Sequence, residues 1–216
     1  MMQHVLTYNE RNIDELIILD INASKEGREP NFEALKEFTS ELYCPVTYGG
    51  GISKLSHIEQ ALKAGADKVS MKSYLGDFKL RTEAVKKFGS QCIVASVDYY
   101  YGMLGIIDYC KMLEEDGIGE ILFNSTELNG TRYGYDISLL NKITNEIKIP
   151  VIANCGCGEP AHMLHAIEWG AHAVAASSMF MFTEYTPRDC AKFLAEHGVP
   201  TRVENNVISD PQKEGA

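Results

Sequence analysis

The sequence predicts an α/β protein, a (β/α)8-type barrel built from two half-barrel repeats. Two observations point to this fold. Seven short apolar segments alternate with stretches of helical periodicity, and the pattern of the first half of the chain recurs in the second half. Strands that are apolar almost throughout, each followed by a helix, are typical of a parallel sheet covered by helices.

The predicted strands are short runs rich in apolar and β-branched residues. They comprise residues 15–21, 44–48, 68–72, 92–98, 120–125, 150–154 and 173–177. Helical spacing follows the strands, for example at Leu55, Ile58 and Leu62. Gly65 and Gly170 stand where two of these helices are expected to end, because glycine is favoured just after a helix.

The internal repeat decides between a barrel and a doubly wound sheet. A shift of 105 residues places residues 45–73 over residues 150–178 without a gap, and matches Gly51 with Gly156 and His57 with His162. The halves of a doubly wound sheet are related differently and share one nucleotide crevice. A duplicated half-barrel therefore explains the repeat better.

Composition limits the partners of this protein. The 216 residues are 45% hydrophobic and 23% charged, with a net charge of -10 and no Lys/Arg-rich block, so neither nucleic acid nor a membrane is an expected partner. Apolar runs are too short to cross a bilayer and the start lacks a signal-peptide pattern, which predicts a cytoplasmic protein. We expect one barrel domain over residues 1–203 and a polar tail over residues 204–216.

The six cysteines are expected to be reduced thiols, because the chain has no leader sequence. Cys155 and Cys157 form a single C-x-C pair without a second pair at similar spacing. The sequence therefore predicts no metal site and no cofactor.

Three consecutive glycines, residues 49–51, follow a predicted strand at the end where barrels place their active sites. A backbone without Cβ atoms can turn sharply and bring N–H groups close to an anion at a helix N-terminus. Gly50 and Gly51 are thus interpreted as a phosphate cradle, with a tight turn as the alternative. Gly156 holds the equivalent place in the other half, and two cradles predict a small substrate with a phosphate at each end.

The next strand ends are expected to complete the cradles. The candidate segments lie at or near these strand ends: Lys72–Ser73 for the first cradle, and Ala176–Ser178 with Asn129–Gly130 for the second. Ser73 and Ser177 could donate their hydroxyl groups. The serines have an alternative role as helix N-caps.

Asp98 ends an otherwise apolar strand, where a barrel directs side chains into its active site. Among apolar neighbours, its pKa is expected to be raised, as suits a general acid or base. Asp20 occupies a similar place. A structural role, as a helix N-cap or in a hydrogen bond to a loop, is an equal alternative for Asp98 and the favoured one for Asp20.

The opposite strand ends carry charges. Glu15 and Glu120 are repeat mates at strand starts, and Lys68 begins another strand. Such charges are tolerated inside a barrel mainly when they pair. They predict either a structural plug or a gated passage for a small polar molecule.

Several segments resemble the cyclase subunit of imidazole glycerol phosphate synthase, a barrel family of histidine biosynthesis. They include LIILDINAS, YGGGI, AGADKVS, FGSQCIVASVD and NGTRYGYD, and the resemblance extends from about residue 14 to 203. It implies a lyase that uses ammonia to cleave and cyclise a bisphosphorylated ribulosyl-aminoimidazole intermediate. It also implies a glutamine amidotransferase (glutaminase) partner that docks at the barrel bottom and sends ammonia through the barrel.

The same resemblance implies roles for individual residues. Asp98 corresponds to one of two catalytic aspartates. Glu15, Lys68 and Glu120 correspond to three positions of a charged ammonia gate. Asp67 and Gln91 correspond to positions that face the glutaminase.

The chain also departs from the family pattern. The family's first strand, with the other catalytic aspartate, a loop lysine and a gate arginine, has no counterpart, and a hairpin after the strand of Asp98 is reduced to YYYGMLG. Residues 127–131 read ELNGT where DxDGT is usual, and Cys155 replaces a glycine. We therefore expect a barrel with an unpaired seam and impaired activity.

Three functions follow from these observations. The first is the ammonia-dependent lyase/cyclase. The second is a weakly catalytic or non-catalytic ammonia-channelling subunit, since LIILDINASKEGREPNF is similar to a branch associated with sugar amidation in surface polysaccharide biosynthesis. The third is an isomerase of a related two-phosphate substrate, for which Asp98 would need a partner carboxylate.

Overall fold

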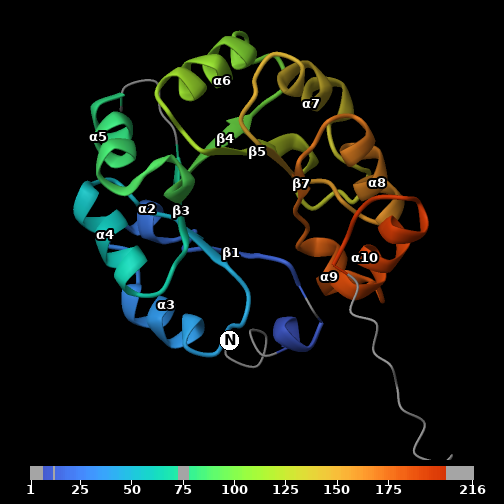
Figure 1. Cartoon of the computed structure of the whole chain (residues 1–216), viewed down its shortest axis with the longest axis horizontal. Coiled ribbons are helices and arrows are strands. Elements are labelled where there is room, and N and C mark those ends of the chain that lie inside the picture. The colour runs from blue at the N-terminus through green and yellow to red at the C-terminus, as the bar shows by residue number, and fades with distance from the viewer. Residues whose placement is uncertain (1–6, 12, 73–77, 203–216) are drawn as a thin grey trace, which may run out of the picture.

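The computed structural model describes residues 7–11, 13–72 and 78–202. Within these residues, no helix is long and apolar enough to cross a membrane. The described chain forms a curled sheet surrounded by helices (Figure 1).

Seven parallel strands form one sheet in the order β1-β2-β3-β4-β5-β6-β7, so each strand pairs with the next one along the chain. Their bounds are β1 Leu16–Leu19, β2 Val46–Gly49, β3 Lys68–Lys72, β4 Ile93–Tyr99, β5 Glu120–Ser125, β6 Val151–Asn154 and β7 Ala173–Val174. In Figure 1 the strands curl around a centre, with β1 and β7 on the two sides of the open seam. The predicted barrel class is confirmed, and no strand of the described residues joins β1 to β7.

The helices are α2 Ala23–Glu26, α3 Phe32–Thr39, α4 Leu55–Lys63, α5 Phe78–Phe88, α6 Ile106–Glu115, α7 Ile137–Thr144, α8 Pro160–Glu168, α9 Ser178–Phe182 and α10 Pro187–Glu196, with short 3-10 turns η1 Ser90–Cys92 and η2 Thr126–Leu128. The longer ones, α3 to α8 and α10, cover the outer side of the curl in chain order (Figure 1). Parallel strands alternating with outer helices leave only the strand ends open to a ligand.

Two apolar layers hold the fold together. The larger cluster packs the helices onto the sheet and includes Val69, Ile93, Ile121 and Val151. A smaller cluster consists of Val94, Leu122 and Ile152, with Ile17 and Ala175 packed against it. Because side chains alternate between the faces of a strand, this second cluster fills the inside of the curl.

The predicted repeat is present in the coordinates. The bounds of β2, α3 and α4 recur 105 residues later in β6, α7 and α8. The N-cap side chains Asn31 and Asp136 each accept a hydrogen bond from the backbone three residues on. Thr39 Oγ1 donates to Ala64 O at 2.6 Å, and its mate Thr144 donates to Trp169 O at 3.3 Å. Local hydrogen bonds are thus conserved between the halves along with the elements.

The strand bounds differ from the predicted ones mainly at the sheet edges. Residues 15–21 were expected as a strand, and β1 covers Leu16–Leu19. Residues 173–177 were expected as another, and β7 covers only Ala173–Val174. Both are edge strands, with one partner each among the described residues, so fewer ladder hydrogen bonds define their ends.

Candidate active site

Two matching loops follow β2 and β6: the first glycine loop (residues 50–53) and the second glycine loop (residues 155–158). Their first two residues share a left-handed backbone, with φ of 95° at Gly50 and 71° at Gly51, and 74° at Cys155 and 93° at Gly156. Since all strands are parallel, both loops lie at the carboxyl-end rim of the curl. The repeat therefore produces two equivalent backbone turns on one rim.

Both loops offer backbone donors. Among the hydrogen bonds of the described residues, none is donated by the backbone N–H of Gly50, Gly51 or Gly156. Each loop leads directly into a helix, α4 or α8, whose N-terminus carries partial positive charge. Unengaged N–H groups beside a helix N-terminus are suited to binding an anion such as phosphate.

Close packing explains why the loops need glycine. A Cβ atom at Gly50 would overlap the backbone of Asp20, and one at Gly156 would overlap Gly134 O. Cys155, the repeat mate of Gly50, adopts the left-handed conformation despite its side chain. The replacement of the family's usual glycine by Cys155 thus leaves the left-handed backbone of the loop in place.

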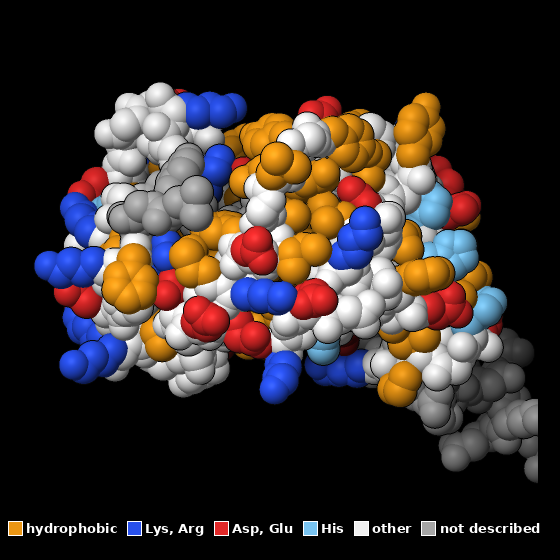
Figure 2. All heavy atoms as spheres, turned by 90° about the horizontal axis from the view of Figure 1, so that it is seen from above, with side chains coloured by type: hydrophobic (Ala, Val, Ile, Leu, Met, Phe, Trp, Pro, Cys, Tyr) orange, Lys and Arg blue, Asp and Glu red, His pale blue; other side chains and the backbone are white. Residues whose placement is uncertain are grey.

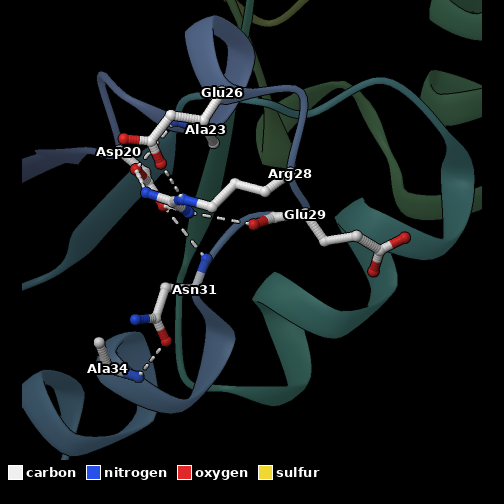
Figure 3. Close-up of polar contacts among 7 residues, drawn as sticks. All are labelled: Asp20, Ala23, Glu26, Arg28, Glu29, Asn31 and Ala34. Atoms are coloured by element: carbon white, nitrogen blue, oxygen red, sulfur yellow. Dashed lines mark hydrogen bonds and ion pairs between the residues drawn. The ribbon is translucent and has the colours of Figure 1, made fainter.

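Asp20 lies beside the first glycine loop, since a Cβ atom at Gly50 would overlap its backbone. Figure 3 shows the polar contacts of its carboxylate. Its Oδ1 and Oδ2 each lie 2.7 Å from a terminal nitrogen of Arg28, in a bidentate pair. The backbone N–H groups of Ala23 and Asn31 also donate to its carboxylate, both at 3.2 Å. This geometry matches the structural alternative for Asp20.

Electrostatics follow from this arrangement. Hydrogen bonds from Arg28 lower the pKa of Asp20, against the opposing effect of burial, and the N–H of Asn31 lowers it further. Asp20 is therefore a carboxylate at neutral pH. It orders residues 20–31, which lie against Gly50 and Gly51.

Asp98, near the end of β4, has polar neighbours. Lys72 Nζ lies 2.9 Å from its Oδ2, and Asn124 Nδ2 donates to its Oδ1 at 2.8 Å. The side chain of Asp98 is 22% exposed and that of Lys72 is 51% exposed. The expectation of an apolar environment around Asp98 is wrong, because adjacent strands place an ammonium and an amide beside it.

The polar contacts continue across the neighbouring strands. Asn124 Nδ2 also lies 3.0 Å from Ser96 Oγ, and Asn154 Nδ2 donates to Asn124 Oδ1 at 2.8 Å. Asp98, Asn124 and Asn154 occupy paired register positions on β4, β5 and β6. The sequence placed Lys72 with the first phosphate cradle and did not single out Asn124 or Asn154. Their position at the ends of apolar strands was the available signal.

The remaining candidates for the phosphate cradles follow β5 and β7 and therefore lie on the same rim. Ala176 is half-buried and Ser177 is exposed at the N-cap position of α9, without a side-chain capping bond. Asn129 and Gly130 are exposed after η2. Ser73 lies outside the described residues. Ser177 thus occupies the N-cap position of α9, but its hydroxyl group makes no capping hydrogen bond.

The loop between β5 and α7 contacts the second glycine loop directly. Gly134 N–H donates to Gly156 O at 2.8 Å, and a Cβ at Gly158 would overlap the backbone of Arg132. Arg132 is exposed and has a left-handed φ of 62°. An arginine therefore lies beside the second glycine loop, a feature that the sequence analysis did not single out.

Exposed apolar side chains also gather at the carboxyl-end rim. They lie in the loops after β4 and β5 and comprise Tyr100, Tyr101, Met103, Leu104 and Tyr133. Figure 2 shows hydrophobic side chains concentrated in the upper part of one face. The rim therefore combines backbone donors with an apolar border.

Three charges meet at the opposite ends of the strands. Lys68 Nζ lies 2.7 Å from Glu120 Oε1 and 3.2 Å from Glu15 Oε2. Burial opposes the charge of Lys68, but the two glutamates outweigh it and raise the pKa of the ammonium. The apolar inner cluster lies between this triad and the polar rim.

The two predicted interface residues lie at this same end. Asp67 precedes β3 and Gln91 precedes β4, and both are exposed. Asp67 Oδ2 accepts the backbone N–H of Val46 at 2.8 Å. Its repeat mate His172 accepts the N–H of Val151 through Nδ1 at 3.3 Å. Asp67 thus has a structural hydrogen bond in addition to its exposed position.

The cysteines show no metal chemistry in the described part of the chain, where no cluster of three His, Cys, Asp or Glu side chains could hold a metal ion. Burial, and then the charge of Asp98, raises the pKa of Cys155 to about 11. Burial also raises the pKa of Cys110 to about 12. These groups are thiols at neutral pH and poor nucleophiles.

The fold and the rim define a class of protein: a duplicated half-barrel with two equivalent glycine loops on one rim and a carboxylate on a strand between them. Residues 1–186 match a family model described as "Histidine biosynthesis protein". The chain belongs to this histidine biosynthesis family, as the sequence resemblance predicted.

Individual relatives narrow the similarity to one subunit. The chain is 40% identical to a Campylobacter jejuni protein provisionally named imidazole glycerol phosphate synthase subunit hisF2, over 91% of this chain and 84% of that protein. It is 37% identical to imidazole glycerol phosphate synthase subunit HisF of Thermococcus onnurineus and 36% identical to that of Haloarcula marismortui, with the same coverage.

Proposed function

We propose that this protein is a lyase/cyclase of the imidazole glycerol phosphate synthase type. In this proposal it uses ammonia to cleave and cyclise a bisphosphorylated ribulosyl-aminoimidazole intermediate. The names of its relatives support the class of enzyme. The arrangement of the rim supports a substrate with two phosphates.

One observation carries the proposal. The two glycine loops follow β2 and β6, and Asp98 lies on β4, the middle strand of the five from β2 to β6. A substrate held by one phosphate at each loop would therefore cross the curl above Asp98. Gly50 and Gly51 would bind one phosphate, and Gly156 the other, through backbone N–H groups.

Asp98 is the proposed general acid/base. Its carboxylate is fixed by Lys72 and Asn124, and it lies inside the curl where it can reach a bound substrate. Asn129, Gly130, Ala176 and Ser177 are on the same rim and are proposed to complete the phosphate sites. Their exposed or half-exposed positions leave them accessible to a ligand.

Ammonia is proposed to enter at the opposite end. Glu15, Lys68 and Glu120 would form the gate, and the apolar inner cluster above them would line a passage for a neutral molecule. A glutaminase subunit is the proposed source of ammonia. Asp67 and Gln91, exposed at that end, are proposed interface residues.

The test is cyclisation of the bisphosphorylated intermediate by the purified full chain with an ammonium salt. Asp98→Asn is the inactive control, because it keeps the shape of the side chain and removes the base. We expect turnover that Asp98→Asn abolishes. Equal rates in the two proteins would refute the catalytic assignment.

A channelling subunit without chemistry of its own has less support, since it needs neither the paired glycine loops nor the fixed carboxylate. The same assay separates the two functions. Stimulation of a glutaminase by a chain that shows no cyclisation would favour channelling.

A further inference from the structure

His57 and His162 are repeat mates that hold the same position in their helices. Each is the third residue of its helix, α4 or α8, and each helix begins at an N-cap, Lys54 or Glu159, whose side chain makes no capping hydrogen bond. Each histidine therefore lies in the first turn of its helix, next to the glycine loop that leads into that helix.

The rings turn back onto the two glycine loops. Ser53 N–H donates to His57 Nδ1 at 3.3 Å, and Gly158 N–H donates to His162 Nδ1 at 3.1 Å. Ser53 and Gly158 are the last residues of the first and second glycine loops. The same ring nitrogen therefore accepts a hydrogen bond from the same loop position in each half.

The opposite ring nitrogen faces a glutamate in each half. His57 Nε2 lies 3.4 Å from Glu29 Oε1, and His162 Nε2 lies 3.6 Å from Glu159 Oε1. In His162, Nδ1 accepts a hydrogen bond from Gly158, so the ring proton belongs on Nε2, toward the carboxylate. In His57 the same tautomer lets Nδ1 accept from Ser53 and directs the Nε2 proton toward Glu29. The side chain of His57 is 5% exposed, so its ring has little freedom to turn away.

This contact determines which loop donors remain open. The ring engages the N–H of Ser53, while those of Gly50 and Gly51 have no acceptor among the described residues. His57 Nδ1 is also 3.1 Å from Gly51 O, which accepts from Nδ1 in the other ring tautomer, so in either tautomer the ring bonds to the backbone of the first glycine loop. The histidine thus fixes the orientation of the peptide groups that would face a phosphate.

We propose that His57 and His162 are positioning residues that hold the first and second glycine loops in their anion-binding shape. The inference rests on the proposed function, since it assumes that the loops bind the two phosphates of the substrate. Neither ring is a catalytic group in this proposal. Each acts through the backbone donors of its own loop.

Two substitutions of His57 distinguish the role of Nδ1 from that of Nε2. Asparagine at position 57 places its side-chain oxygen near the former Nδ1, and glutamine places it near the former Nε2. His57→Asn should therefore keep the hydrogen bond from Ser53, whereas His57→Gln and His57→Leu should lose it. Parallel substitutions at His162 test the second loop.

The readout is a titration of the full chain with inorganic phosphate, followed by the backbone amide signals of Gly50, Gly51 and Gly156 in NMR spectra. In the unsubstituted protein we expect all three signals to move. His57→Leu and His57→Gln should raise the phosphate dissociation constant reported by Gly50 and Gly51 about fivefold, the loss expected for one hydrogen bond. His57→Asn should stay near the original value, and Gly156 should be unaffected and serve as the internal control.

The outcomes distinguish the inference from the function on which it rests. If phosphate moves none of the glycine signals in the unsubstituted protein, the phosphate sites are wrong and the inference falls with them. If the signals move and His57→Gln binds phosphate as tightly as His57→Asn, only the positioning role is overturned. Should His57→Leu fail to fold, the asparagine and glutamine pair still decides.

Discussion

Lys72 Nζ lies 2.9 Å from Asp98 Oδ2, across two adjacent strands at the carboxyl-end rim. With Asn124 on the other carboxylate oxygen, this ion pair fixes both oxygens of the proposed catalytic carboxylate. The ammonium group of Lys72 thus lies beside Asp98. The resemblance assigns the position of Asp98 to one of two catalytic aspartates.

Lys72→Met should reduce kcat for cyclisation about tenfold to a hundredfold, the effect of losing one charge-assisted hydrogen bond. Lys72→Arg should restore most of the rate, because it keeps the charge near Asp98. Lys79→Met, on the exposed surface of α5, is the matched control and should leave kcat unchanged. Steady-state kinetics with an ammonium salt measures all three. A Lys72→Met enzyme with unaltered kcat would contradict a role for the pair.

The buried ion pair between Arg81 and Asp116 should be critical for stability. Its nitrogen–oxygen distance is 2.7 Å, and the two side chains are almost fully buried. Arg81→Met should lower the free energy of unfolding by about 3 to 5 kcal/mol, because it leaves a buried carboxylate without its cation. Urea denaturation of this variant and of Arg81→Met/Asp116→Leu measures the effect. The double variant should recover much of the loss, and a lower stability than that of the single variant would contradict this account.

Cys155 should carry backbone strain, since its φ of 74° is a conformation that side chains disfavour. Cys155→Gly should be more stable than Cys155→Ala by about 1 kcal/mol, because both remove the thiol and only glycine relieves the strain. Thermal unfolding of the two variants tests this. Equal stability would indicate that the loop relaxes around any residue.

Asp20 should contribute to the acid sensitivity of the fold. Its pKa in the folded protein is lowered by Arg28, so it binds protons less readily than in the unfolded chain. Its contribution to stability is therefore full above the unfolded pKa of about 4 and is lost as the pH falls through the lower folded value. The unfolding free energy of Asp20→Asn, measured from pH 6 to pH 3, should decline less steeply than that of the unsubstituted protein. Parallel declines would contradict the assignment.

Much of this protein could be inferred from local patterns. Apolar runs and helical periodicity depend on residues close in the chain, and the 105-residue repeat is visible without coordinates. Because the strands are parallel, their carboxyl ends lie at one rim, and Gly51 and Gly156 were correctly expected at the same end of the sheet. The pairing of Lys68 with Glu15 and Glu120 also followed, because charges inside a barrel need partners.

Only the tertiary structure decided what surrounds those positions. Lys72, Asp98, Asn124 and Asn154 lie on four different strands, and their contacts depend on sheet register and side-chain conformation. The bidentate pair of Asp20 and Arg28 likewise depends on how one loop folds back on itself. Sequence determines which element a residue belongs to, because that is a local property. Which side chains meet depends on how strands align, and alignment is set by packing of the whole sheet.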